Sequence, residues 1–267
     1  MTIISNLLKS SNKRSSLIPF ITAGYPDLYT TEKALEIFDR LGVDVIELGL
    51  PYSDPLADGP IIQEASSKAL KTGVTIDHIL QLLEKVKSKI KTPLILFTYY
   101  NPIIARGIQS FIMEISHAGF KGLIIPDLPL EEADYIISLC KNFSIELILL
   151  LTPTSSSQRI EKIINKSQGV IYVVSSTGVT GIRENIQIEM KDFISNLRAM
   201  TDQALILGFG ISQAKHVQQI MDWDIDGIVI GSAFVRCLSD SDYGNGLVRL
   251  EEFCNSIVSV IQMQENK

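Results

Sequence analysis

The sequence has few cysteines, and they do not fall in pairs. Cys140, Cys237 and Cys254 are the only three in 267 residues, and no CxxC motif occurs. A disulfide framework or a structural zinc site needs closely spaced cysteines, so the spacing argues against both. It predicts reduced thiols in a cytoplasmic protein.

Long apolar runs and a positive net charge are also missing. The best apolar run, 147–151, has strand length, far below the ~20 residues of a membrane span. The first 16 residues have no long apolar stretch after their charges, so they do not read as a secretory signal. The net charge of −6 argues against a nucleic-acid protein. We therefore expect no membrane and no nucleic-acid partner, although backbone N–H groups can still bind a phosphate.

The motifs of several enzyme classes are absent. There is no HExxH, GxSxG or GxxxxGK[ST] pattern, and these patterns mark zinc peptidases, serine hydrolases and P-loop proteins. The three histidines, His78, His117 and His216, stand far apart in helical stretches. We expect no metal site in this chain.

Short aliphatic runs alternate with amphipathic ones along the chain. Eight of the aliphatic runs predict strands, at 17–22, 43–49, 94–99, 122–125, 146–150, 170–174, 204–207 and 227–230. Helical patterns lie between them, for example at 31–41, where Thr30 or Thr31 is expected to cap the helix. Strand followed by helix, repeated eight times, predicts a parallel sheet.

The parallel sheet can close in two ways, as a barrel or as an open doubly wound sheet. Eight strands, a length near the ~250 residues of a (β/α)8 barrel and no GxGxxG after the first strand favour the barrel. The fold prediction is an α/β (β/α)8 TIM barrel that forms a single domain, residues 1–267. A short extra helix is expected at the N-terminus, and another after strand 8.

Glu47 is the first candidate for chemistry. Alternation along the second predicted strand turns Val45, Glu47 and Gly49 toward the barrel interior. A carboxyl group buried there should have a raised pKa and suit proton transfer. A structural glutamate paired with a buried donor is the alternative. Asp58, in the loop after this strand, is either a second carboxylate with a different role or only a turn residue.

Glycines follow the last three predicted strands. The segments are 178–181 (GVTG), 208–212 (GFGIS) and Gly231-Ser232. Glycine lets backbone N–H groups approach a phosphate, and barrels frequently bind one after strands 7 and 8, beside a short extra helix. We therefore predict a phosphate site there. Tyr172, on the sixth strand, either lines the pocket or fills the core.

The sequence resembles the α subunit of tryptophan synthase nearly end to end. The most specific segment is 47–60 (ELGLPYSDPLADGP), and further matches are 20–26 (FITAGYP), 99–102 (YYNP), 126–129 (PDLP), 178–181 and 208–212. The resemblance implies a lyase of L-tryptophan biosynthesis. Its reaction would cleave indole-3-glycerol phosphate, by a retro-aldol step, to indole and glyceraldehyde 3-phosphate.

The resemblance also implies roles for single residues. Glu47 would be the general acid and base, and Asp58 would bind the indole N–H. The aromatic residues would line the indole pocket, a threonine would help to close the site over Asp58, and the remaining groups would hold the phosphate. The residues implied in substrate binding are Phe20, Tyr172, Thr180, Gly181, Phe209, Gly210, Gly231 and Ser232.

The family works as an α2β2 complex, so the resemblance implies a tryptophan synthase β subunit as the partner. Pyridoxal phosphate would belong to that partner, and no cofactor is expected in this chain. Residues 52–58 and 101–106 lie in the family's contact region. Two alternatives stay open: a free-standing indole-releasing lyase, and an allosteric binding subunit whose own chemistry has decayed.

Overall fold

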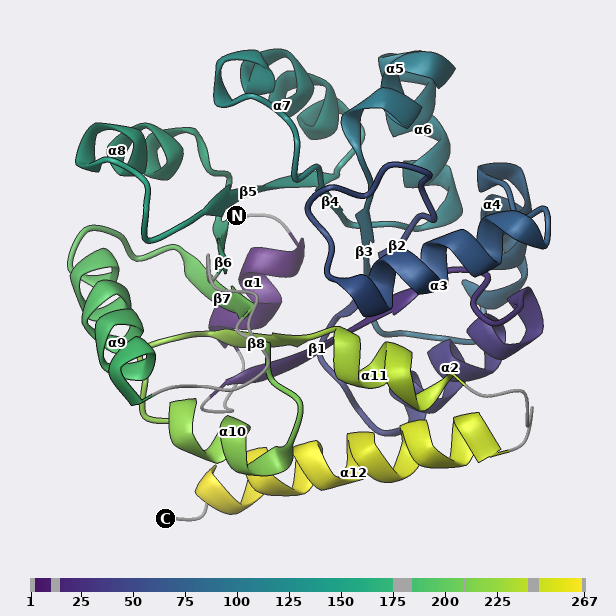
Figure 1. Cartoon of the computed structure of the whole chain (residues 1–267). Helices are drawn as coiled ribbons and strands as arrows, with labels where there is room; N and C mark the ends of the chain where they lie inside the picture. Colours follow the sequence, from purple (N-terminus) through teal and green to yellow (C-terminus); the bar gives the residue numbers. More distant parts are fainter. Residues whose placement is uncertain (1–2, 11–14, 175–183, 209, 240–244, 266–267) are drawn as a thin grey trace.

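Eight parallel strands form a closed barrel in chain order (Figure 1). The computed structural model describes residues 3–10, 15–174, 184–208, 210–239 and 245–265, and this strand count refers to those residues. The prediction of a (β/α)8 barrel is confirmed. The strands are β1 (Ser16–Thr22), β2 (Ile46–Gly49), β3 (Leu94–Phe97), β4 (Gly122–Ile124), β5 (Glu146–Leu151), β6 (Val170–Val174), β7 (Ala204–Gly208) and β8 (Gly227–Ile230).

The predicted two faces of β2 are confirmed. Val45, just before the strand, packs in the cluster of buried side chains that fills the barrel. Ile46 and Leu48 belong to the larger cluster between the strands and the helices. Because side chains alternate along a strand, Glu47 faces the barrel interior with Val45.

The second strand begins at Ile46, later than its apolar pattern predicts. Asp44 explains the difference, because its carboxylate accepts the Leu17 N–H at 3.0 Å. The Asp44 N–H also donates to the Leu17 carbonyl at 3.3 Å, so Asp44 bonds to Leu17 through both its side chain and its backbone. The ladder between β1 and β2 starts further on, where Phe20 is paired with Glu47. On the other side of β2, the Ile46 N–H donates to the Pro93 carbonyl at 3.0 Å, and the pairing with β3 starts at Ile46.

Helices surround the strands (Figure 1). The first of them, α2, is capped by Asp27, whose carboxylate accepts the Thr30 N–H at 2.7 Å. The expected threonine cap was wrong, because the Thr31 hydroxyl is used elsewhere and accepts the Gly24 N–H at 2.9 Å. The helices are α2 (Leu28–Arg40), α3 (Pro60–Lys71), α4 (Ile76–Val86), α5 (Tyr100–Arg106), α6 (Ile108–Ala118), η1 (Leu130–Glu132), α7 (Ala133–Asn142), α8 (Ser157–Lys166), α9 (Glu184–Arg198), α10 (Ala214–Ile220) and α12 (Asn245–Glu265).

Both predicted extra helices are confirmed. α1 (Ile3–Ser10) closes the N-terminal end of the barrel, where Ile4 and Leu8 join the interior cluster. Glu146, buried at the start of β5, accepts the Ser5 N–H of this helix at 3.3 Å. α11 (Ser232–Cys237) follows β8 directly, at the opposite end of the barrel. None of the helices in the described residues is long and apolar enough to cross a membrane.

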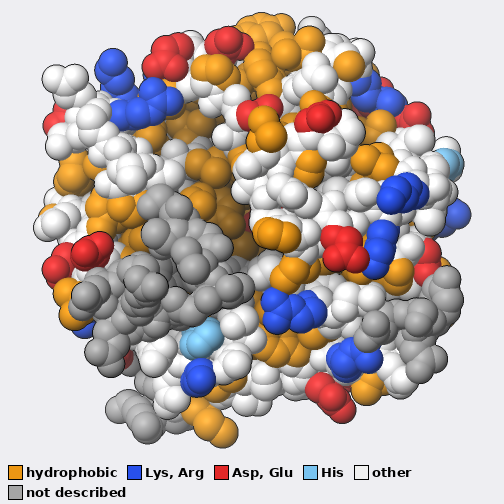
Figure 2. Space-filling model, in the orientation of Figure 1, with side chains coloured by type: hydrophobic (Ala, Val, Ile, Leu, Met, Phe, Trp, Pro, Cys, Tyr) orange, Lys and Arg blue, Asp and Glu red, His pale blue; other side chains and the backbone are white. Residues whose placement is uncertain are grey.

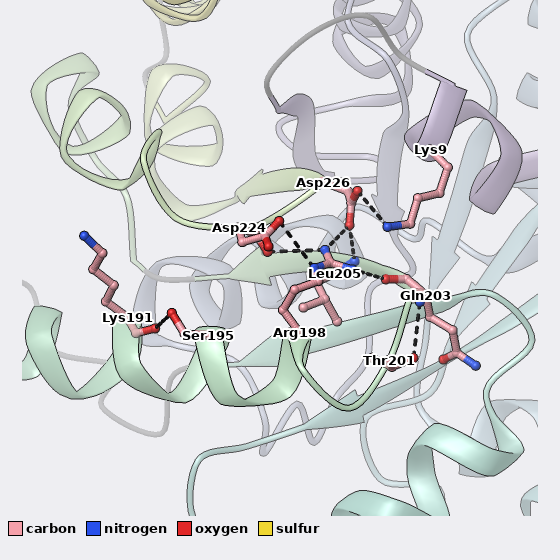
Figure 3. Close-up of polar contacts among 9 residues, drawn as sticks. All are labelled: Lys9, Lys191, Ser195, Arg198, Thr201, Gln203, Leu205, Asp224 and Asp226. Carbon is pink, nitrogen blue, oxygen red and sulfur yellow. Dashed lines mark hydrogen bonds and ion pairs between the residues drawn. The ribbon is translucent and has the colours of Figure 1, made fainter.

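A polar network ties α1 and α9 to the N-terminal ends of β7 and β8 (Figure 3). Arg198, the last residue of α9, pairs with Asp226 at 2.5 Å. Asp226 also lies 3.2 Å from the ammonium group of Lys9, on α1, and accepts the Leu205 N–H at 2.8 Å. These contacts stabilise the N-terminal end of the barrel, which α1 covers. The candidate site lies at the opposite, C-terminal end.

Candidate active site at the C-terminal end of the barrel

Hydrophobic side chains line a hollow over the middle of the barrel (Figure 2). Three residues singled out in the sequence lie on different strands of the barrel. They are Phe20 on β1, Glu47 on β2 and Tyr172 on β6. In the described part of the chain, no group of three or more His, Cys, Asp or Glu side chains is placed to hold a metal ion.

Glu47 is buried on the inward face of β2. Its side chain is 1% exposed, and its strand partner is Phe20 of β1. Among the described residues, its Oε2 atom has no hydrogen-bond partner. Burial, together with the charge of Asp58, raises the pKa of the Glu47 carboxyl to about 8. The carboxyl is therefore protonated at neutral pH and able to give a proton to a substrate.

Asp58 lies in the loop between β2 and α3. Its N–H donates to the Pro55 carbonyl at 3.0 Å, and its own carbonyl accepts the Gln63 side-chain amide at 2.9 Å. Burial raises the pKa of the Asp58 carboxyl to about 6, and a hydrogen bond from Tyr99 opposes that rise. At neutral pH the two carboxyl groups are thus in opposite states, because Asp58 is ionised and Glu47 is protonated.

Tyr99, to which the sequence assigned no role, contacts Asp58 directly. Its hydroxyl donates to Asp58 Oδ2 at 2.9 Å and accepts the Ala57 N–H at 3.0 Å. The side chain is buried and stacks on Tyr52, with ring centroids 5.0 Å apart. The sequence contained one indication of its position. Tyr99 lies two residues after Phe97, so alternation along the strand turns both side chains toward the barrel interior. The partner 41 residues away was not readable from any local pattern.

Two aromatic rings lie against glycines of the neighbouring strands. A Cβ atom added to Gly49 would lie 2.5 Å from Cζ of Phe20. A Cβ atom added to Gly208, on β7, would lie 2.8 Å from the hydroxyl of Tyr172. Burial first, and then the charges of Glu47 and Asp58, raise the pKa of the Tyr172 hydroxyl. The structure therefore brings Phe20 and Tyr172 to the same end of the barrel as the two carboxyl groups.

We expect Gly208→Ala to lower stability, because the added methyl would overlap the Tyr172 ring. Overpacking of a buried site costs about 1–3 kcal/mol, which thermal unfolding would detect. Gly59→Ser is the control, since the φ of Gly59 is −76°, nothing lies within 4 Å of an added Cβ, and serine is favoured at this N-cap position of α3. Equal destabilisation of the two variants would contradict the overlap.

Three of the four predicted phosphate-binding residues, Gly210, Gly231 and Ser232, lie after β7 and β8. Gly231 precedes Ser232, the first residue of α11, and a Cβ on Gly231 would lie 3.4 Å from the Phe20 ring. Gly210 has a φ of +61°, a left-handed conformation that favours glycine, and open space around it. Three predicted residues fall outside the described part of the chain: Thr180, Gly181 and Phe209.

Exposed apolar side chains and a cavity mark the outer side of the loop after β2. Leu56 is 92% exposed, and Ile104, on α5, is 51% exposed. Tyr52 and Pro55 help to line a cavity of about 420 Å³.

Comparison with known proteins identifies relatives along nearly the whole chain. The family model described as tryptophan synthase alpha chain matches residues 7–262. The tryptophan synthase alpha chain of Pyropia yezoensis is 53% identical over 97% of this chain and 100% of its own length. That of Gracilaria tenuistipitata var. liui is 51% identical over 100% and 99%.

Solved structures of tryptophan synthases have the same fold. A Mycobacterium tuberculosis tryptophan synthase chain is 30% identical, covers 97% of this chain and 98% of its own, and superposes with a TM-score of 0.88. A chain of the tryptophan synthase α2β2 complex of Pyrococcus furiosus is 32% identical, covers 92% and 99%, and superposes with a TM-score of 0.86. The barrel fold is therefore shared with solved tryptophan synthase structures.

Proposed function

Because the chain belongs to the tryptophan synthase alpha chain family, we propose that it cleaves indole-3-glycerol phosphate to indole and glyceraldehyde 3-phosphate. The chain is a lyase subunit. One observation carries the assignment of its chemistry. Two carboxyl groups, Glu47 and Asp58, stand at one end of the barrel, and their surroundings favour opposite protonation states at neutral pH.

In this proposal Glu47 moves the protons of the retro-aldol cleavage. Its protonated carboxyl gives a proton to C3 of the indole, which turns the ring into an electron sink. The resulting carboxylate takes the proton of the glycerol hydroxyl as the C–C bond breaks and the aldehyde forms. The bonding electrons return to the ring, and Glu47 ends the cycle protonated. The Oε2 atom is buried and has no hydrogen-bond partner among the described residues, which supports this role, because its hydrogen-bonding capacity is left for a substrate.

Asp58 has the complementary role. The indole nitrogen gains positive charge once C3 is protonated, and an ionised carboxylate beside the N–H stabilises that charge. We place the indole ring between Phe20 and Tyr172. The phosphate would then be held by backbone N–H groups at Gly210, Gly231 and Ser232. We also propose that Thr180, Gly181 and Phe209 contact the substrate, as the family resemblance implies.

Indole release from indole-3-glycerol phosphate tests the proposal directly. We expect slow release by the full chain alone and faster release after a tryptophan synthase β subunit is added. No release in either condition would overturn the lyase assignment. Fast release that the β subunit does not change, with no complex in size exclusion, would point to a free-standing lyase instead.

The proposed roles predict a bell-shaped dependence of kcat/KM on pH. Activity should fall below about pH 6, where Asp58 becomes protonated and can no longer balance the charge on the indole nitrogen. It should also fall above about pH 8, where Glu47 loses the proton that it must deliver. Initial rates of indole release between pH 5 and pH 9 would show both limbs. A profile that is flat across this range would contradict the assignment of these two groups.

We propose that the partner is a tryptophan synthase β subunit in an α2β2 complex, and that pyridoxal phosphate is bound by that subunit. The exposed Leu56 and Ile104 and the cavity beside Tyr52 support this surface as the contact.

We also propose a cytoplasmic location, which the three unpaired cysteines support. Residues 1–267 as one domain remain part of the proposal, supported by strands that run from Ser16 to Ile230.

A further inference from the structure

We propose that Tyr99 is a positioning residue for the reaction, because its hydroxyl holds the Asp58 carboxylate in place and favours its ionised form. This inference rests on the proposed function, in which Asp58 must be ionised beside the indole nitrogen. Tyr99 itself is not required to touch the substrate. Its action is exerted entirely through Asp58 and the backbone next to it.

The geometry fixes the direction of both hydrogen bonds. The Tyr99 hydroxyl accepts the Ala57 N–H at 3.0 Å, so its own proton is directed to Asp58 Oδ2, 2.9 Å away. Burial and the charge of Asp58 raise the pKa of the Tyr99 hydroxyl, so the proton stays on the tyrosine. A neutral donor aimed at a carboxylate stabilises the carboxylate and not the acid.

The ring of Tyr99 is itself held firmly. It is 2% exposed, stacks on Tyr52 with an interplanar angle of 27°, and meets Phe97 edge to face with ring centroids 6.1 Å apart. A donor fixed by packing costs little entropy when it binds the carboxylate. The loop around Asp58 is therefore anchored to the end of β3 at a defined point.

The charged and titratable groups around Asp58 come from three strands or their ends. In the described part of the chain they are Glu47 on β2, Tyr99 after β3 and Tyr172 on β6. The charge of Asp127, which follows β4, also raises the pKa of the Tyr99 hydroxyl. Glu47 is protonated at neutral pH, and among these groups Tyr99 is the one that donates a hydrogen bond to the carboxylate.

Tyr99→Phe tests the proposal, because it removes the hydroxyl and keeps the stacked ring. We expect the pKa of the Asp58 carboxyl to rise by about 0.5–1 unit. The variant removes one hydrogen bond to the ionised carboxylate, and the loss of one modest interaction of this kind corresponds to a pKa shift of about one unit. The titration can be followed without substrate by NMR of the full chain with ¹³C-labelled aspartate, and Asp58→Asn identifies the signal. The acid limb of kcat/KM should move to higher pH by the same amount.

Two control variants separate the donor from a general loosening of the loop. Tyr52→Phe removes a hydroxyl from the neighbouring stacked ring, where its partner is Asn101 at 3.4 Å. Gln63→Met removes the side-chain donor to the Asp58 carbonyl and leaves the carboxylate untouched. Neither variant should move the Asp58 titration, whatever it does to the rate.

The outcomes distinguish this inference from the proposed function. An Asp58 titration that is the same in Tyr99→Phe and in the parent chain would overturn the role of Tyr99. A shift in Gln63→Met as large as that in Tyr99→Phe would overturn it too, because loop loosening would then explain both. A parent chain that releases no indole would overturn the proposed function, and the NMR titration would still decide the Tyr99–Asp58 interaction.

Discussion

Replacing Glu47 by glutamine should lower kcat for indole release by about 10²–10⁴-fold, the usual contribution of a positioned acid or base. Glutamine has nearly the same shape, but it can neither release a proton to C3 nor take one from the glycerol hydroxyl. Both halves of the proposed cleavage therefore fail together. Steady-state release of indole at pH 7 measures the loss, and turnover like that of the parent chain would remove Glu47 from the mechanism.

Glu146→Gln is the matched control for that experiment. Glu146 is also a buried glutamate, and burial raises the pKa of its carboxyl to about 7. It lies at the N-terminal end of β5, where it accepts the Ser5 N–H of α1. We expect this variant to keep the kcat of the parent chain. A similar loss of activity in both variants would mean that the loss of a buried carboxyl group, and not its position in the barrel, controls the rate.

Glu47→Gln should also stabilise the folded chain near neutral pH. The carboxyl pKa rises from 4.5 in the unfolded chain to about 8 on folding, so stability is highest below pH 4.5 and is lost as the pH rises toward 8. At pH 7 this linkage amounts to about 3 kcal/mol, part of which the buried amide offsets. Thermal unfolding should show an advantage of the variant that grows from pH 5 to pH 8. An advantage independent of pH would contradict the buried carboxyl as its source.

Much of the barrel could be predicted because hydrophobic alternation is a local property. The aliphatic runs located all of the strands in the described residues, and parity along β2 was enough to place Glu47 on the inward face. Element ends were less predictable, because long-range or competing side chains decide them. Asp44 delays the start of β2 by pairing with Leu17, and Asp27 displaces the expected threonine cap of α2.

The site was only partly readable for the same reason. Glu47 has a periodic pattern around it, whereas the loop sequence around Asp58 fits a plain turn equally well. Asp58 was a candidate as a second carboxylate, and only the family resemblance favoured that role over a turn. Its contact with Tyr99 depends on how two loops meet in space. The residues proposed after β6, Thr180 and Gly181, together with Phe209, lie outside the described chain and stay predictions.

Asp58→Asn should reduce kcat/KM by about 10²–10³-fold, as expected when one charge-stabilising group is removed from a site. Asparagine is well suited to separate catalysis from turn formation. The turn depends on the backbone of residue 58, whose N–H donates to Pro55 and whose carbonyl accepts Gln63. Asparagine keeps both bonds and is itself favoured in turns. A residue needed only for the turn would therefore show almost no loss.

The same variant should leave a second signature on Glu47. The charge of Asp58 contributes to the raised pKa of the Glu47 carboxyl, after burial. Removing that charge should lower the Glu47 pKa, so the alkaline limb of the residual activity should move to lower pH while the acid limb disappears. Asp54→Asn, an exposed carboxylate in the same loop, controls for loss of charge alone and should change neither limb. If Asp58→Asn kept the kcat/KM and both limbs of the parent chain, Asp58 would be a turn residue, and the charge on the indole nitrogen would need another partner.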